Sequence, residues 1–200
     1  MARSLEGKKV AALVARGFEQ VELLQPMEAL EMAGAMVDVV SPETGGKVRG
    51  WNKTEWGEEV DVDVTLADAS SENYDALLLP GGVMNPDILR TIPQAVQFTR
   101  EFFDAGKPIA SICHGPWTLV EADVVRGLRV TSWPSLETDL ENAGAEWTDA
   151  QVVVDRGIVT SRKPEDIPAF AEKMIEEIAE GQHGTPGHRA KGRGAGASSR

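Results

Sequence analysis

The chain has little of the chemistry that forms cross-links or binds metals, with one cysteine, Cys113, and three histidines in 200 residues. A single cysteine cannot form a disulfide within the chain, so the fold needs no oxidising compartment, and we expect a cytoplasmic protein. These thiol and imidazole groups are also too few for an ordinary zinc site. We therefore expect neither a metal nor another cofactor.

Features of membrane proteins and nucleic-acid-binding proteins are also scarce. No apolar run approaches the roughly 18 residues that a membrane span requires, and the first residues lead directly into a strand-like segment, so we expect no span and no secretory signal. With 20 basic and 32 acidic residues, the formal net charge is −12. This charge disfavours binding to a nucleic-acid backbone.

The basic residues are concentrated at the end of the chain. Residues 184–200 contain five glycines and four basic residues but no acid. Such a composition cannot bury enough apolar surface to offset its ordering entropy, so we expect a disordered tail, without function or in contact with an acidic partner. The remaining residues, 1–183, carry a formal net charge of −16 and are interpreted as one globular domain.

Strand-like and helix-like segments alternate along the domain. Continuous apolar runs such as 10–15 (VAALVA) and 76–79 (ALLL) are typical of strands buried on both faces, and segments with helical spacing lie between them. This alternation predicts a single-domain α/β sandwich with a mostly parallel sheet. We predict strands at 10–15, 36–40, 76–79, 108–112, 128–131, 151–154 and 158–161, helices at 19–33, 93–105, 116–125, 137–142 and 164–180, and a loop-rich stretch over 41–60.

This fold class indicates where a site would lie. In open α/β sheets, ligands bind beyond the carboxyl ends of the strands, near helix N-termini. Three segments occupy such places, namely residues 16–22, 80–87 and 113–117. Trp51 and Trp56, in the glycine-rich stretch, either border this pocket or join an interface.

The most informative segment is residues 111–116, SICHGP. It predicts a cysteine on a sharp strand-to-helix turn, where the helix N-terminus favours the thiolate. The peptide N–H of His114 is then placed to bind an oxyanion. The alternative is a buried cysteine that acts as a small hydrophobe. The turn and the neighbouring His, Gly and Pro favour a functional thiol.

Two further positions bear on that thiol. Gly82 follows a buried strand, so its backbone can approach a ligand and supply a second oxyanion donor. Glu19 lies where the first strand gives way to a helix. It is either an acid that stabilises the helix start or a carboxyl beside the thiolate, protonated and donating a hydrogen bond.

Four ordered motifs together resemble the ThiJ/PfpI superfamily, and within it the PfpI-type intracellular cysteine peptidases. They are GFEQVE at 17–22, LPGG at 79–82, ASICHGP at 110–116 and TSWP at 131–134, and the likeness extends from about residue 10 to 178. The resemblance implies a three-layer flavodoxin-like sandwich of the class I glutamine amidotransferase type.

The resemblance also implies roles for individual residues. Cys113 would be the nucleophile, His114 its general base, and Glu19 a group beside the sulfur. Asp87 matches the position of an acid that orients the histidine from a neighbouring subunit, although this chain has Asp and one extra residue where the peptidases have Glu. The expected assembly is a homodimer or a larger ring such as a hexamer.

Several activities are compatible with these residues. We favour a stress-related cysteine hydrolase, a peptidase or a deglycase, that acts on small or unfolded peptides or on carbonyl adducts. The alternative is an oxidative-stress sensor or a holdase chaperone that uses Cys113. A cofactor-free glyoxalase is less favoured because Trp133 stands where such relatives often have histidine. Glutamine amidotransfer is disfavoured because neither His183 nor His188 is followed by an acid two residues later.

Overall fold

The computed structural model describes residues 4–183 and contains a central sheet of seven strands. The strand order is β10-β11-β7-β6-β1-β2-β5, and every neighbouring pair is parallel except β10 and β11. The strands are β1 (Lys9–Leu13), β2 (Met36–Ser41), β5 (Val64–Thr65), β6 (Ala76–Leu79), β7 (Ile109–Ile112), β10 (Val152–Asp155) and β11 (Ile158–Ser161). The predicted tail, 184–200, lies outside the described residues.

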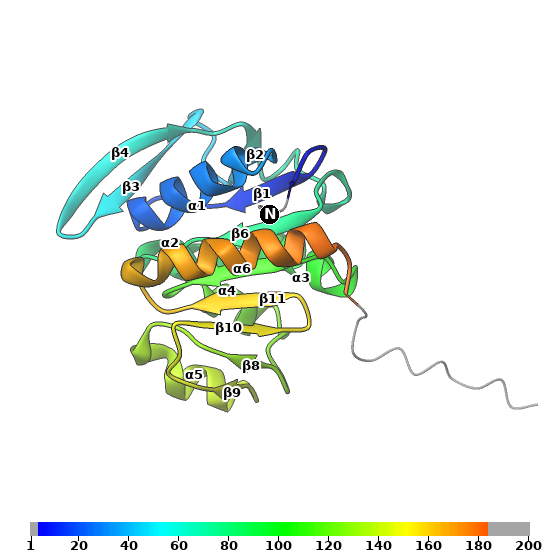
Figure 1. Cartoon of the computed structure of the whole chain (residues 1–200). Helices are drawn as coiled ribbons and strands as arrows, with labels where there is room; N and C mark the ends of the chain where they lie inside the picture. Colours follow the sequence, from blue (N-terminus) through cyan, green and yellow to red (C-terminus); the bar gives the residue numbers. More distant parts are fainter. Residues whose placement is uncertain (1–3, 184–200) are drawn as a thin grey trace, which may run out of the picture.

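Helices cover both faces of this sheet (Figure 1). One hydrophobic cluster joins the sheet to α1 (Gln20–Met32) and α6 (Ile167–Glu180). A second cluster on the opposite face joins it to α2 (Met84–Leu89), α3 (Pro93–Asp104) and α4 (Pro116–Glu121). The central strands are buried on both faces because their sequences are continuously apolar. The predicted mostly parallel, three-layer α/β sandwich is confirmed.

The prediction of a loop over residues 41–60 is wrong. This stretch forms an antiparallel hairpin of β3 (Lys47–Asn52) and β4 (Glu55–Asp61), which extends from the body beside the start of α1 (Figure 1). Trp51 and Trp56 pack edge-to-face across the two strands, with ring centroids 5.4 Å apart. Cross-strand aromatic pairs stabilise hairpins, but single-residue composition does not reveal the pairing.

Other elements differ from expectation in extent. The helix predicted over 116–125 ends at Glu121, because Asp123 adopts a left-handed conformation with φ of 53°. Helix α2 was not predicted. The segment 128–131 contributes β8 (Arg129–Val130), which pairs with β9 (Glu146–Trp147) apart from the central sheet. The remaining short elements are η1 (Ser71–Asn73), η2 (Pro134–Leu136), α5 (Glu137–Asn142) and η3 (Pro164–Asp166).

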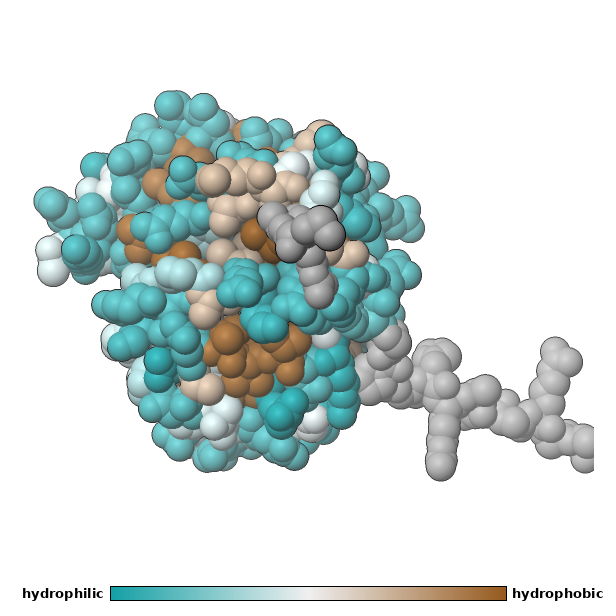
Figure 2. Space-filling model, viewed as in Figure 1, coloured by the Kyte–Doolittle hydropathy of each residue, from teal (hydrophilic) through white to brown (hydrophobic). Residues whose placement is uncertain are grey.

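The surface that includes α6 is mostly hydrophilic (Figure 2). A compact apolar patch lies below α6, over the β10–β11 edge of the sheet, where half-buried Val152 and Val154 pack against the core. Within residues 4–183, none of the helices combines the length and apolarity needed to traverse a bilayer.

Candidate functional site

A sharp turn between β7 and α4 presents Cys113 above the sheet edge. Cys113 has a φ of 63°, which is strained for any residue with a Cβ. Both of its peptide groups are held, because its N–H donates to the carbonyl of Ser161 (3.0 Å) and its carbonyl accepts from the N–H of Trp133 (2.9 Å). Gly115 completes the turn, since a Cβ there would lie 2.6 Å from the carbonyl oxygen of Leu79. The turn therefore fixes the thiol in one position.

His114 provides a base next to that thiol. Its Nδ1 lies 3.2 Å from Sγ of Cys113. The ring stacks on the indole of Trp133, with centroids 6.0 Å apart, and meets Trp117 edge-on at 5.2 Å. Burial lowers the pKa of His114 to about 4. The imidazole is therefore neutral at pH 7 and can accept a proton from the thiol.

The carboxyl group beside the sulfur belongs to Glu22. This side chain is fully buried, and its Oε2 accepts a hydrogen bond of 3.0 Å from the N–H of Gly81. Burial raises the pKa of Glu22 to about 8, and the charge of Glu19 acts in the same direction. Glu22 also hydrogen-bonds to Cys113. The carboxyl and the thiol thus both stay protonated at neutral pH, because two anions in this buried space would repel each other.

The structure places Glu19 at the wall of the pocket instead of against the sulfur. Glu19 precedes the first residue of α1 and makes no side-chain cap hydrogen bond. Its carboxylate accepts a hydrogen bond from the backbone N–H of Lys53, at the tip of the hairpin, while burial raises its pKa. The missed signal for Glu22 was an acid on the buried side of α1, together with Leu23 and Leu30.

Backbone N–H groups of Gly82 and His114 both hydrogen-bond to the Cys113 side chain. Gly82 has a φ of 78°, and a Cβ there would lie 2.5 Å from the carbonyl oxygen of Gly17, so glycine is required. The structure brings together the two predicted oxyanion donors at the sulfur. Burial raises the pKa of Cys113, and these two N–H groups oppose it. The sequence predicts a thiolate at Cys113, whereas burial of the side chain within this chain favours the neutral thiol.

Asp87 is exposed on α2 and does not border the pocket of its own chain. Its predicted role across a subunit interface stays a prediction. Nearby Asn85, which sequence reasoning missed, is fully buried. Its Oδ1 accepts from the N–H of Ala15 (2.7 Å), and its Nδ2 donates to the carbonyls of Pro80 (2.9 Å) and Gly81 (3.2 Å). Asn85 thereby ties the glycine turn to the end of β1.

These groups lie in a pocket of about 690 Å³. Trp51 from the hairpin and Trp133 provide aromatic walls, and Lys53 and Lys163 provide positive charges. The lining residues are Gly17, Glu19, Val21, Glu22, Trp51, Lys53, Gly82, Val83, Met84, Cys113, His114, Trp133, Lys163, Pro164 and Glu165. The volume suits a small molecule or the side chain of a larger one.

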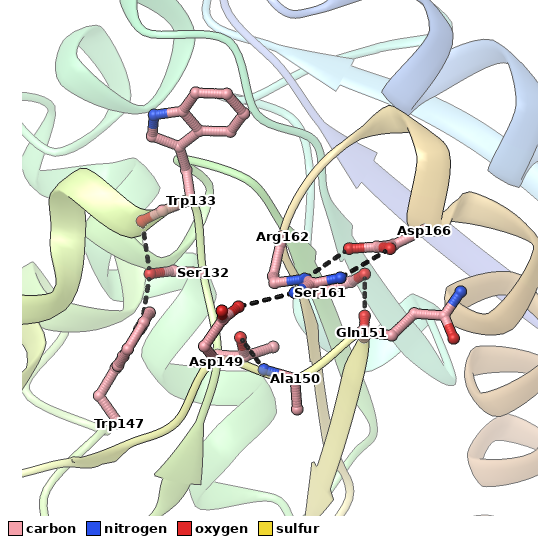
Figure 3. A network of polar contacts seen from close by, with 10 residues as sticks. Ser132, Trp133, Trp147, Asp149, Ala150, Gln151, Ser161, Arg162 and Asp166 are labelled. Carbon is pink, nitrogen blue, oxygen red and sulfur yellow. Dashed lines mark hydrogen bonds and ion pairs between the residues drawn. The ribbon is translucent and has the colours of Figure 1, made fainter.

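A polar network beside the pocket holds the segments that support the turn (Figure 3). Arg162 bonds to Asp149 (2.7 Å) and to both carboxylate oxygens of Asp166 (2.8 and 3.2 Å). The adjacent Ser161 hydroxyl donates to the carbonyl of Gln151 (2.7 Å), while the Ser161 carbonyl accepts from Cys113. The cysteine backbone is thus anchored to β11 and, through it, to the start of α6.

The described part of the chain contains one trio of side chains with metal-binding geometry, Glu177, Glu180 and His183. It lies at the end of α6 and shares no residue with the cysteine pocket. Within this trio, Nε2 of His183 lies 3.2 Å from the Glu177 carboxylate.

A strained cysteine between a parallel strand and a helix, with backbone donors and a histidine at its sulfur, defines a nucleophile elbow in an α/β protein. The chain belongs to the DJ-1/PfpI family, whose sequence model matches residues 8–177. The resemblance stated from the motifs is therefore confirmed, along with the fold.

Curated relatives cover most of this chain. A Bacillus subtilis protein named "Putative cysteine protease YraA" is 42% identical over 168 residues, which are 84% of this chain and 96% of the relative. Escherichia coli "Protein/nucleic acid deglycase 2" is 42% identical over 170 residues, with the same two coverages. "General stress protein 18" of B. subtilis is 43% identical over 170 residues, again with 84% and 96% covered.

Solved structures show the same fold. Drosophila melanogaster DJ-1beta matches with a TM-score of 0.78 and 29% identity, over 86% of this chain and 90% of that one. A two-domain protein of Anabaena variabilis, with a DJ-1/ThiJ/PfpI-like and a ferritin-like domain, matches with a TM-score of 0.80 and 35% identity. The match covers 86% of this chain but 48% of that protein, so this chain spans about half of its length.

Proposed function

We propose that the protein is a cysteine-dependent hydrolase that separates amines from carbonyl or acyl carbon atoms. The observation that carries this proposal is the 3.2 Å contact between Sγ of Cys113 and Nδ1 of His114 at the base of an aromatic-walled pocket. Relatives named as a deglycase and as a cysteine protease support the same chemistry. The pocket volume favours adducts of small dicarbonyls on amines over long peptides.

In the first step, Sγ bonds to the electrophilic carbon while the thiol proton passes to Nδ1 of His114. The N–H groups of Gly82 and His114 stabilise the negative charge that develops on the substrate oxygen. The carbon–nitrogen bond then breaks, and the leaving amine takes the proton from Nδ1. Water, deprotonated by Nδ1, releases the product as an acid or a hydrated aldehyde and returns the proton to the sulfur.

Substitution of the nucleophile tests the proposal. Amine release from a methylglyoxal–amine adduct and from short peptides would be measured for the wild type, Cys113→Ser and Cys113→Ala. The proposal predicts that both variants lose at least about 10³-fold in kcat, because the sulfur forms the covalent bond. Wild-type turnover in Cys113→Ala would refute it. If the wild type releases amine from only one of the two substrate classes, that class is the preferred one.

Oligomerisation belongs to this proposal as well. We propose a cytoplasmic homodimer or larger ring in which Asp87 of one subunit faces the site of another. The exposure of Asp87 and its place on α2, directly after the glycine turn, support this assignment. Light scattering that found only monomers at working concentration would remove Asp87 from the mechanism.

A second candidate function, oxidant sensing, is favoured by the carboxyl of Glu22. A carboxyl whose pKa burial raises to about 8 can donate a hydrogen bond to an oxygen added on the neighbouring sulfur. Two equivalents of peroxide would convert the thiol to a sulfinic acid and release two waters. Intact mass after mild peroxide would show a gain of about 32 Da in the wild type and none in Cys113→Ser. Absence of that species together with robust turnover would exclude this role.

A further inference from the structure

The imidazole of His114 has two polar neighbours among residues 4–183. On one side, Nδ1 faces Sγ of Cys113 at 3.2 Å, and on the other, Nε2 lies 3.4 Å from Oγ of Ser135. The faces and edges of the ring are taken by the indoles of Trp117 and Trp133. With 8% of its surface exposed, His114 depends on these neighbours to satisfy its two nitrogens.

The groups around the sulfur determine which nitrogen carries the proton. Sγ of Cys113 already accepts hydrogen bonds from the N–H groups of Gly82 and His114. Its own proton has two acceptors within reach, the Glu22 carboxyl, to which the thiol hydrogen-bonds, and Nδ1 of His114 at 3.2 Å. The proposed hydrolase step passes this proton to Nδ1, so the lone pair of Nδ1 must face the thiol. In a neutral imidazole the proton is then on Nε2.

The proton on Nε2 requires an acceptor in turn, and Oγ of Ser135 is placed to accept it. A distance of 3.4 Å is long, but hydrogen bonds of this kind tighten when substrate binds. A hydroxyl group can accept this bond and donate its own proton to solvent, because Ser135 is exposed.

Backbone hydrogen bonds fix Ser135 relative to the nucleophile. Ser135 lies in η2, which begins directly after Trp133, and the N–H of Trp133 donates to the carbonyl of Cys113 (2.9 Å). The carbonyl of Trp133 accepts from the N–H of Leu136 (3.0 Å) and from the hydroxyl of Ser132 (2.9 Å). Ser132 is itself bonded by the indole N–H of Trp147 (3.0 Å, Figure 3). The turn that carries Ser135 is therefore hydrogen-bonded to Cys113, whose thiol faces His114.

We propose that Ser135 is a positioning residue of the catalytic histidine, supplied by the same subunit. By accepting the Nε2 proton, Ser135 holds His114 in the tautomer whose Nδ1 accepts the thiol proton. The proposal deepens the hydrolase mechanism and rests on it for its effect on turnover. It also contrasts with the predicted role of Asp87, because a carboxylate from a neighbouring subunit would compete with Ser135 for the same proton.

The tautomer can be measured without any substrate. Nitrogen-15 NMR of protein labelled at the histidine rings distinguishes a protonated from an unprotonated ring nitrogen, and the spectrum of His114→Gln assigns the His114 signals. The full-length wild type should show a protonated Nε2 and an unprotonated Nδ1 at pH 7. In Ser135→Ala the two tautomers should mix, whereas Ser135→Thr should restore the wild-type pattern.

Kinetics provide the second readout. Loss of this hydrogen bond in Ser135→Ala should lower kcat and the rate of Cys113 alkylation by iodoacetamide by about 3- to 10-fold, and Ser135→Thr should recover both. Ser70→Ala, which removes an exposed hydroxyl away from the pocket, is the matched control and should change nothing.

Three outcomes would overturn the inference. They are a wild-type ring protonated on Nδ1, unchanged tautomer and alkylation rate in Ser135→Ala, or a tautomer change in Asp87→Ala that Ser135→Ala lacks. If the wild type hydrolyses none of the tested substrates but Ser135→Ala still alters the tautomer, the positioning role stands while the hydrolase proposal fails.

Discussion

The two walls of the pocket are built in different ways. The inner wall consists of the short turns after β6 and β7 and the first turn of α1, where Cys113, His114 and Glu22 are buried. The outer wall is the β3–β4 hairpin, which contributes Trp51 and Lys53 and whose second strand is mostly exposed. The groups that contact the sulfur therefore lie on the buried wall, and the hairpin residues that line the pocket lie on the more exposed one.

The largest effect on kcat should come from replacing His114, the base on the inner wall. His114→Ala should lower kcat by about 10²- to 10⁴-fold, because the thiol loses the imidazole that lies 3.2 Å from it. His183→Ala, at the end of α6, removes a histidine paired with Glu177 and should leave kcat unchanged. Amine release at saturating substrate measures both. Comparable losses in the two variants would mean that the effect arises from stability and not from the site.

Glycine substitutions compare the tolerance of the two walls. A Cβ on Gly81 would lie 2.6 Å from Cβ of Cys113 and 2.8 Å from the Ile112 carbonyl, and it would also meet the Glu22 carboxylate. Because buried backbone cannot yield, Gly81→Ala should destabilise the protein by about 3 kcal/mol.

The matched change on the hairpin is Gly57→Ala, whose Cβ would meet the end of the flexible Gln20 side chain. That side chain can move away by giving up its two exposed hydrogen bonds to Glu58 (2.8 and 3.2 Å), so the cost should be about 1 kcal/mol and stay below that of Gly81→Ala. Urea unfolding, with m held equal between the variants, measures both free energies. Equal losses would contradict the view that the inner wall is the rigid one.

The buried acid gives the inner wall a pH dependence. Burial raises the pKa of Glu22 to about 8, so between pH 4.5 and 8 the folded state binds a proton that the unfolded state has lost. Stability should therefore fall as pH rises through this window. Glu22→Gln stays neutral at every pH, so it should flatten this slope and exceed the wild type in stability above pH 8 by up to about 5 kcal/mol.

Glu19→Gln is the control for that experiment. Burial raises the pKa of Glu19 as well, but this side chain is only half-buried on the outer side of the pocket, so its effect should be smaller. Melting temperatures from pH 5 to 9 measure both slopes. A steeper change in Glu19→Gln than in Glu22→Gln would reverse the placement of the two acids.

The sequence predicted the inner wall better than the outer one. The runs VAALVA and ALLL identify buried strands, and SICHGP identifies the turn, because the relevant interactions there are local. The choice between Glu19 and Glu22 depends on how α1 is rotated about its axis, and a shift of three residues moves a carboxyl from the rim to the sulfur. Asn85 was missed because its bond to Ala15 joins residues 70 apart.

The hairpin was missed for a related reason. Its pairing of Trp51 with Trp56 becomes visible only when the two strands are in register, and the glycines between residues 41 and 60 favour a loop in any local interpretation. The proposed role of Ser135 was not predicted from the sequence either, since it depends on a contact with a histidine 21 residues earlier. Long-range contacts of these kinds are determined by the fold and not by local propensity.

The smallest predicted effect concerns the tip of the hairpin. Lys53 has a φ of 58°, a left-handed conformation that costs a residue with a side chain about 1–2 kcal/mol. Its backbone makes the useful contacts, because its carbonyl accepts from the indole N–H of Trp51 (2.8 Å) and its N–H donates to Glu19. Lys53→Gly keeps both bonds and relieves the strain, so it should stabilise the protein by about 0.5 kcal/mol after the entropy cost of glycine. Thr54→Gly, one residue later and without a left-handed φ, should destabilise it by a similar amount. Thermal unfolding measures both, and destabilisation by Lys53→Gly would mean that the lysine side chain, and not the backbone of the tip, holds the outer wall in place.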